Sequence, residues 1–172
     1  MNKKWLLGLF ASLMFSQSAY ANNFNYNFLE FRTATDPKFS GVEFNTLVLQ
    51  NVHFIARVDS QFEGDADIAT GFGFNGPINQ FADVFGQAIV HSISYPDEQG
   101  KDRETLGEFN IGLRVWLSNQ IEATTRFGKL DENSVFHAGL RFHSTDQLSL
   151  AAETRNSGIY GPQLALSVRF QF

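Results

Sequence analysis

The segment from Leu164 to Phe172, at the carboxyl terminus, alternates strictly between apolar side chains and polar or small ones. Because successive side chains of a β-strand point to opposite faces, a strand made of this segment has one apolar face and one polar face. The apolar face carries Leu164, Leu166, Val168, Phe170 and Phe172. Such a strand needs an apolar medium on one side only, so the segment predicts a sheet with two unlike surfaces.

The same period of two recurs along most of the sequence, and no stretch after the first 21 residues keeps a helical period over three turns. The clearest alternating stretches are residues 42–48, 56–62, 68–74, 109–117, 121–127, 136–142 and 148–152. A first strand within 24–35 and a less regular one within 83–95 complete the set. The pattern predicts about ten strands of about ten residues, the length that a tilted strand needs to cross a bilayer, or eight strands if two weak segments are loops.

Clusters of turn-forming residues separate these stretches. They are Gln50–Asn51, Gly64–Asp65, Asn75–Pro77, Pro96–Gly100, Ser118–Gln120, Asp131–Asn133, Ser144–Asp146 and Asn156–Gly158. Connections this short predict hairpins between neighbouring strands, with neither a plug nor a separate extracellular domain. An even number of strands places both ends of the chain on the same side of the membrane, which would be the periplasmic side.

The first 21 residues have the three parts of a secretory signal peptide. Lys3 and Lys4 supply the charge, Trp5 to Phe15 is the apolar run, and Ala19 to Ala21 is a small-x-small cleavage site. A transmembrane anchor would need about twenty apolar residues, and the run breaks at Ser16. We therefore expect residues 1–21 to be removed on export and residues 22–172 to form a single domain.

The composition narrows the class of protein further. The formal net charge is −5, and it becomes more negative when the two lysines of the signal peptide are removed. An acidic chain argues against a nucleic-acid partner and against a basic surface for anionic headgroups. Cysteine is absent, so disulfides and thiolate chemistry are not available. An exported chain of this kind must be held by its own fold, as a closed barrel is by its hydrogen-bond ladder.

The polar phase of the strands bears on which face of the sheet meets lipid. A soluble lipocalin-like barrel, binding an apolar ligand in the periplasm, would show the same alternation with the faces exchanged. The polar phase carries acidic residues and arginines in equal number, which suits charge pairing in a closed interior. Phenylalanines of the apolar phase gather near strand ends, where the girdles of membrane barrels lie. These features predict a lumen charge network of Glu43, Arg57, Asp59, Glu63, Glu108, Arg114, Glu122, Arg126, Arg141, Glu153, Arg155 and Arg169.

Together these features resemble the small Gram-negative outer-membrane β-barrels, the porin-like and OmpA/OmpX-like superfamily. Within it, the run Gly112-Leu113-Arg114, the turn from Ser144 to Gln147 and the closing arginine and aromatic pair resemble a group whose role is mostly unassigned. The resemblance implies an all-β, transmembrane, antiparallel up-and-down barrel in the outer membrane. It also implies contacts with lipid and lipopolysaccharide, a monomeric state, and reading of the carboxyl-terminal strand by the barrel assembly machinery.

Function is less constrained than fold. Barrels of eight to ten strands are filled by side chains, so a wide aqueous channel is not expected. The favoured prediction is a non-enzymatic envelope protein with a structural or surface-contact role and a closed, charge-paired polar interior, with a narrow channel as a variant of it.

A lipid-modifying hydrolase is the alternative from another class. Its site would combine His91 with Ser92 or Ser94 and with the acids Asp97 and Glu98 at the membrane rim. Neighbours on one strand face opposite ways, however, so His91 and Ser92 would not share a face. The His143-Ser144 pair falls in what would be a periplasmic turn.

No cofactor or metal is expected. The four histidines are scattered and lack zinc spacing, and His137 and His143 are separated by roughly 20 Å along one strand. Residues 71–76 resemble a phosphate-binding loop only in their glycines, because no helix follows. The acidic segment 97–104 is better explained as a solvated loop than as a calcium site.

Overall fold

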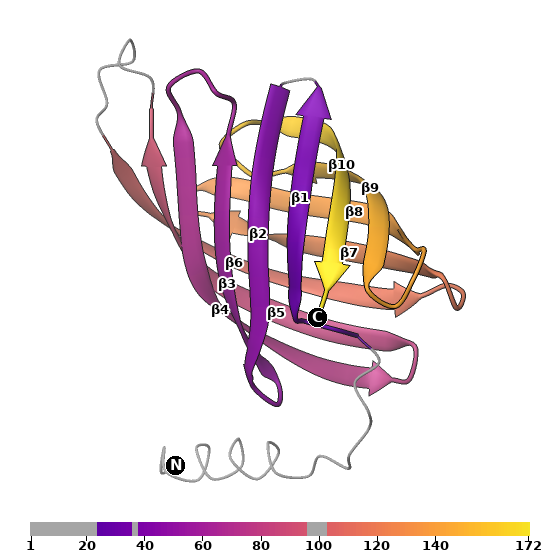
Figure 1. The fold of residues 1–172 in the computed structure, drawn as a ribbon. Coiled ribbons are helices and arrows are strands. Elements are labelled where there is room, and N and C mark those ends of the chain that lie inside the picture. The colour runs from indigo at the N-terminus through magenta and orange to yellow at the C-terminus, as the bar shows by residue number, and fades with distance from the viewer. Residues whose placement is uncertain (1–23, 36–37, 96–102) are drawn as a thin grey trace, which may run out of the picture.

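The computed structural model describes residues 24–35, 38–95 and 103–172. Over these ranges the chain forms ten antiparallel strands that close into one barrel (Figure 1). The strands are β1 (Phe28–Thr35), β2 (Lys38–Leu49), β3 (Val52–Ser60), β4 (Ala66–Asn79), β5 (Ala82–Ser94), β6 (Glu104–Trp116), β7 (Ile121–Leu130), β8 (Asn133–His143), β9 (Leu148–Asn156) and β10 (Pro162–Gln171). The prediction of an up-and-down barrel is confirmed with ten strands rather than eight, while the expected signal peptide lies outside the described residues.

Closure comes from pairing of the first strand with the last. β1 lies antiparallel to β10, with Phe31 opposite Val168 and Ala34 opposite Ala165. The backbone N–H of Phe172 also donates to the carbonyl of Asn27 at 3.2 Å. The start of β1 and the end of β10 therefore lie together, at what we call the terminal end of the barrel; the other end is the opposite end.

One predicted turn is wrong. Asn75-Gly76-Pro77 does not end a strand, because β4 continues to Asn79, and Gly76 and Pro77 pair with Val84 and Asp83 of β5. The register shifts between Pro77 and Asn79, at the strand end. Proline lacks the amide that a central ladder position needs, and it is tolerated beside such an irregularity.

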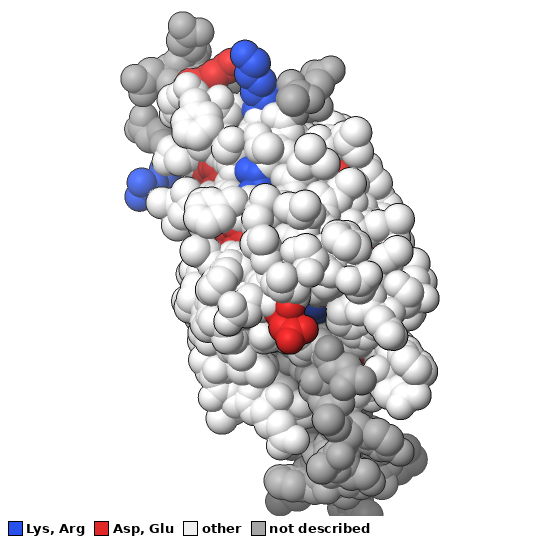
Figure 2. Space-filling model, turned by 45° about the vertical axis from the view of Figure 1, so that its right-hand side comes forward, with Lys and Arg blue, Asp and Glu red and all other residues white. Residues whose placement is uncertain are grey.

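The apolar phase of the strands forms the outer surface. Phe31, Phe72, Phe109 and Leu164 have exposed fractions of 53, 56, 70 and 71 %. Figure 2 shows a face that is mostly uncharged, with most of the charged side chains in view lying in its upper part. This arrangement is the reverse of a lipocalin-like barrel, whose apolar residues line the interior, so the soluble alternative is wrong. Among the described residues, no helix has the length and apolar character to cross a membrane.

Aromatic pairs on the outer wall lie toward both ends. Phe127 and Phe136 approach to 5.1 Å between ring centroids near the opposite end, and Phe44 and Phe172 to 6.1 Å near the terminal end. Aromatic rings near both ends are typical of the interfaces of membrane barrels, although Phe31, Phe72 and Phe109 are exposed in the middle of their strands.

Arginine substitutions at different depths test this surface. Ile111 lies in the middle of β6 with 60 % of its surface exposed, so Ile111→Arg places a charge near the bilayer midplane and should lower the free energy of unfolding by about 2–4 kcal/mol. Leu117 is equally exposed, 60 %, but lies just beyond β6 at the barrel end, where Leu117→Arg should cost about 0–1 kcal/mol. Urea unfolding in lipid vesicles measures both, and equal costs would contradict the orientation.

Candidate functional site in the barrel lumen

The polar phase of the strands fills the barrel interior. All of the predicted network residues except Glu63 lie on the lumen side of their strands. Glu63 is exposed in the turn between β3 and β4, because β3 ends at Ser60 and its alternation stops there. In that turn the Asp65 carboxylate accepts the backbone N–H groups of Gln61 and Glu63. The inclusion of Glu63 in the network is therefore wrong.

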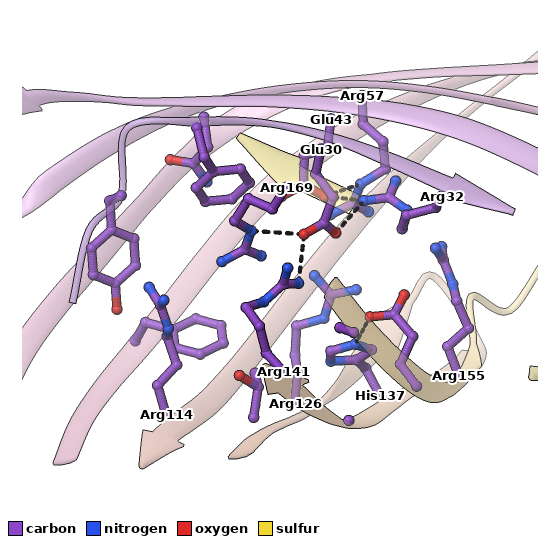
Figure 3. Close-up of a pocket in the computed structure, with 18 of the residues that line it drawn as sticks. Glu30, Arg32, Glu43, Arg57, Arg114, Arg126, His137, Arg141, Arg155 and Arg169 are labelled. Atoms are coloured by element: carbon purple, nitrogen blue, oxygen red, sulfur yellow. Dashed lines mark hydrogen bonds and ion pairs between the residues drawn. The ribbon is translucent and has the colours of Figure 1, made fainter. Parts of the chain in front are cut away.

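Glu30 is the centre of the charge network, although the sequence pattern did not single it out. Its side chain is 4 % exposed, and its Oε2 accepts from Arg141 Nη2 at 2.6 Å and from Arg169 Nε at 2.7 Å. Arg32 Nη1 lies 3.5 Å from its Oε1. One carboxylate thus joins β1, β8 and β10 across the lumen, as Figure 3 shows by dashed lines.

A second cluster extends the network toward the opposite end. Glu43 accepts from Arg32 at 2.7 Å and from Arg57 at 3.0 Å. Asp59 lies 3.1 Å from Arg32 and 3.6 Å from Arg155. These pairs tie β1, β2, β3 and β9 together, so side chains occupy the interior of this half.

The histidines belong to the same network. His91 lies between two carboxylates, with Nδ1 2.9 Å from Asp67 and Nε2 2.9 Å from Glu108. His91 is buried in the lumen, while Ser92 follows it on the outward phase of β5. The Asp97 and Glu98 of the hydrolase alternative lie outside the described residues.

Two of the other three histidines, His137 and His143, also lie beside lumen carboxylates. Nε2 of His137 lies 2.8 Å from Glu153, and Nε2 of His143 lies 3.2 Å from Glu122. No group of three or more possible metal ligands occurs among the residues that the structure describes.

A cavity of about 70 Å³ lies at the centre of the lumen. Its charged lining consists of Glu30, Glu43 and Glu153 against Arg32, Arg57, Arg114, Arg126, Arg141, Arg155 and Arg169, with His137 beside them. Figure 3 shows these arginines converging from several strands, with Arg126 among them. The cavity is therefore small, polar and rich in positive charge.

The chain just before β1 closes the terminal end of this cavity, contrary to the prediction that there is no plug. Phe24 and Tyr26 are each 3 % exposed and pack in the lumen with Phe85. Phe24 stacks on Trp116 at 5.7 Å between ring centroids, and Tyr26 stacks on His53 at 4.7 Å. The prediction considered only the connections between strands, whereas this plug, residues 24–27, precedes the first strand.

Polar contacts fix the plug in place. The Tyr26 hydroxyl donates to Asp83 at 2.8 Å, and the guanidinium carbon of Arg114 lies 4.9 Å from the ring centroids of Phe24 and Tyr26. Arg114 also donates to the carbonyl of Asn25 at 3.2 Å. Cation–π contacts and a buried hydrogen bond of this kind hold a short segment without a strand ladder.

Arg114 stands at the junction of two spaces. It lines the central cavity, and it also lines a space of about 370 Å³ at the terminal end, with Asn25, Trp116, Glu122, His143 and the β8–β9 turn. Glu122 holds its guanidinium by two hydrogen bonds, at 2.8 and 3.0 Å. We call the larger space the vestibule.

Two solved structures have an architecture similar to this one. A KdgM porin in complex with disordered oligogalacturonate superposes with a TM-score of 0.60 and 7% sequence identity, over 84% of this chain and 99% of that one. A second KdgM porin structure gives 0.58, with the same identity and coverage. The fold is that of the outer-membrane porins.

A third solved structure, the Acinetobacter baumannii outer membrane protein Omp33, is less similar, with a TM-score of 0.41 and 10% identity over 79% of this chain and 58% of that one. No family model matches the sequence, and no curated protein does.

Proposed function

We propose that this protein is a narrow outer-membrane channel of the porin type that carries small anions and is closed in the conformation described here. The observation that supports it is the pair of polar spaces that meet at Arg114, one of them lined by seven arginines and three glutamates. Clustered positive charge in a low-dielectric lumen favours anions and repels cations.

The size of the cavity limits the solute. A volume of about 70 Å³ holds only a few water-sized molecules, so it accepts an inorganic ion but not a sugar. Oligogalacturonate, which one KdgM porin binds, is too large for this lumen as it stands. The proposed solutes are accordingly small anions rather than oligosaccharides.

We also propose that the barrel is non-enzymatic. A rim hydrolase would need a hydroxyl nucleophile beside its base. His91 instead lies between Asp67 and Glu108 inside the lumen, and Ser92 is on the other face of β5. The monomeric state, the lipopolysaccharide contact and recognition of the carboxyl-terminal strand by the assembly machinery remain predictions.

Ion selectivity tests the proposed channel. Purified protein in a planar bilayer under a KCl gradient should give small conductance steps with a reversal potential of the sign that reports chloride permeation. Arg126→Gln should move that potential toward zero, because it removes a lumen cation. Lys129→Gln, which removes an exposed cation near the end of β7, should leave the potential unchanged. Cation selectivity would overturn the proposal. So would the absence of any conductance in both the wild type and the variant Phe24→Ala/Tyr26→Ala, which lacks the two rings of the plug.

A further inference from the structure

Arg126 is a lumen arginine without a direct ion pair among the described residues. It lies in β7, and it forms no ion pair with any residue in the described ranges. Its Nη1 donates to the amide oxygen of Gln87 at 3.3 Å, while its Nε is buried and has no acceptor. A guanidinium so placed has neither a direct ion pair nor a full set of hydrogen bonds to offset its removal from water.

The glutamates that line the cavity are already engaged by other side chains. Glu30 binds Arg141 and Arg169, Glu43 binds Arg32 and Arg57, and Glu153 binds His137. Glu43 and Glu108 act on Arg126 from beyond ion-pair distance. The cavity lining therefore carries an excess of positive charge, with seven arginines against three glutamates.

Other arginines of the cavity also have buried donors without an acceptor. Arg57 Nη2 and Arg155 Nε are buried and have no acceptor, and these residues are only 3 and 4 % exposed. Both line the cavity with Arg126 and are its like-charged neighbours. Arg32 Nε is likewise buried without an acceptor, so four guanidinium groups present unpartnered donors in and around one small space. Native proteins leave few buried donors unsatisfied, so such a concentration points to a missing acceptor.

We propose that the central cavity holds one small inorganic anion of about the size of chloride, bound by Arg126 together with Arg57 and Arg155. The volume of about 70 Å³ admits such an ion with a few water molecules and excludes large organic anions. The ion supplies the negative charge that the lining lacks, so it is a component of the folded barrel. This goes beyond transport, because the site is occupied whether or not the lumen conducts.

Thermal unfolding in chloride and in gluconate tests the site. Gluconate is too large for the cavity, so replacing chloride by gluconate at constant ionic strength removes the ion without changing screening. The melting temperature of the detergent-solubilised wild type should rise with chloride concentration and then saturate, as binding to the folded state alone requires. Bromide should replace chloride, and its anomalous signal in crystals should lie beside Arg126.

The variant Arg126→Gln gives the sharper result. In gluconate it should melt at a higher temperature than the wild type, because it removes a buried charge that nothing neutralises. In saturating chloride that order should reverse, and the dependence on chloride should vanish in the variant. Lys129→Gln should keep the wild-type chloride dependence, since Lys129 is exposed. A melting temperature that does not depend on chloride concentration would overturn the proposed site, and so would an equal rise in Arg126→Gln. Neither result would bear on the proposal that the lumen conducts anions.

Discussion

Replacing Glu30 by Gln is expected to lower the free energy of unfolding of the barrel by about 3–5 kcal/mol. The substitution keeps the shape of the side chain but removes the charge that holds Arg141 and Arg169 at 2.6 and 2.7 Å. Both arginines stay buried, so they cannot recover their hydration. Urea unfolding in lipid vesicles, followed by loss of β-structure, measures the change.

Two comparisons separate this loss from a general sensitivity of the chain. Glu63→Gln makes the same chemical change in the exposed turn between β3 and β4, and it should cost nothing measurable. In the double variant Glu30→Gln/Arg141→Gln, one of the stranded cations is also removed. Its cost should be clearly smaller than the sum of the two single costs, because the residues interact. Additive costs would show that Glu30 is not the centre of the network.

Alternation along the strands was enough to predict the fold and most of the interior. The sequence from Phe109 to Leu117 places Asn110, Gly112 and Arg114 in one phase, and the structure places that phase in the lumen. A period of two assigns each side chain to one face of the sheet, because a strand has only two faces. The same rule failed at Glu63, since a period carries no information on where a strand stops.

The residues that the sequence did not reveal are those whose role depends on tertiary contacts. Glu30 and Arg32 follow Phe28 in a lumen phase that mixes an aromatic ring with charges, so β1 lacks a clean pattern. Glu30 also meets Arg141, a partner 111 residues away, through closure of the barrel. Such a contact depends on strand number and register, which local alternation does not specify.

The plug was hidden for a related reason. Phe24 and Tyr26 alternate with polar residues as the side chains of a strand do, so the sequence predicts that they belong to the start of the first strand. In the structure β1 begins only at Phe28, and these two rings pack inside the barrel end against Trp116 and His53. Shape complementarity with the lumen, rather than a ladder of hydrogen bonds, decides their position.

Removal of the two plug rings should open the lumen. In the variant Phe24→Ala/Tyr26→Ala, Arg114 loses both aromatic faces at 4.9 Å, and Asp83 loses the hydroxyl that binds it. The vestibule of about 370 Å³ should then join the central cavity past Arg114, whose guanidinium stays bound to Glu122. Single-channel conductance in planar bilayers should rise several-fold, and the current should keep its anion preference because the arginines of the lining remain.

The matched change Phe62→Ala removes an exposed ring from the β3–β4 turn and should leave conductance at the wild-type level. Gel mobility with and without boiling shows whether each variant is still a folded barrel, so an opened lumen can be told from a damaged wall. An intact Phe24→Ala/Tyr26→Ala barrel with wild-type conductance would mean that the charge network alone closes the lumen. The seal would then lie at Glu30 and Glu43, whose ion pairs cross the interior between β1, β2, β3, β8 and β10.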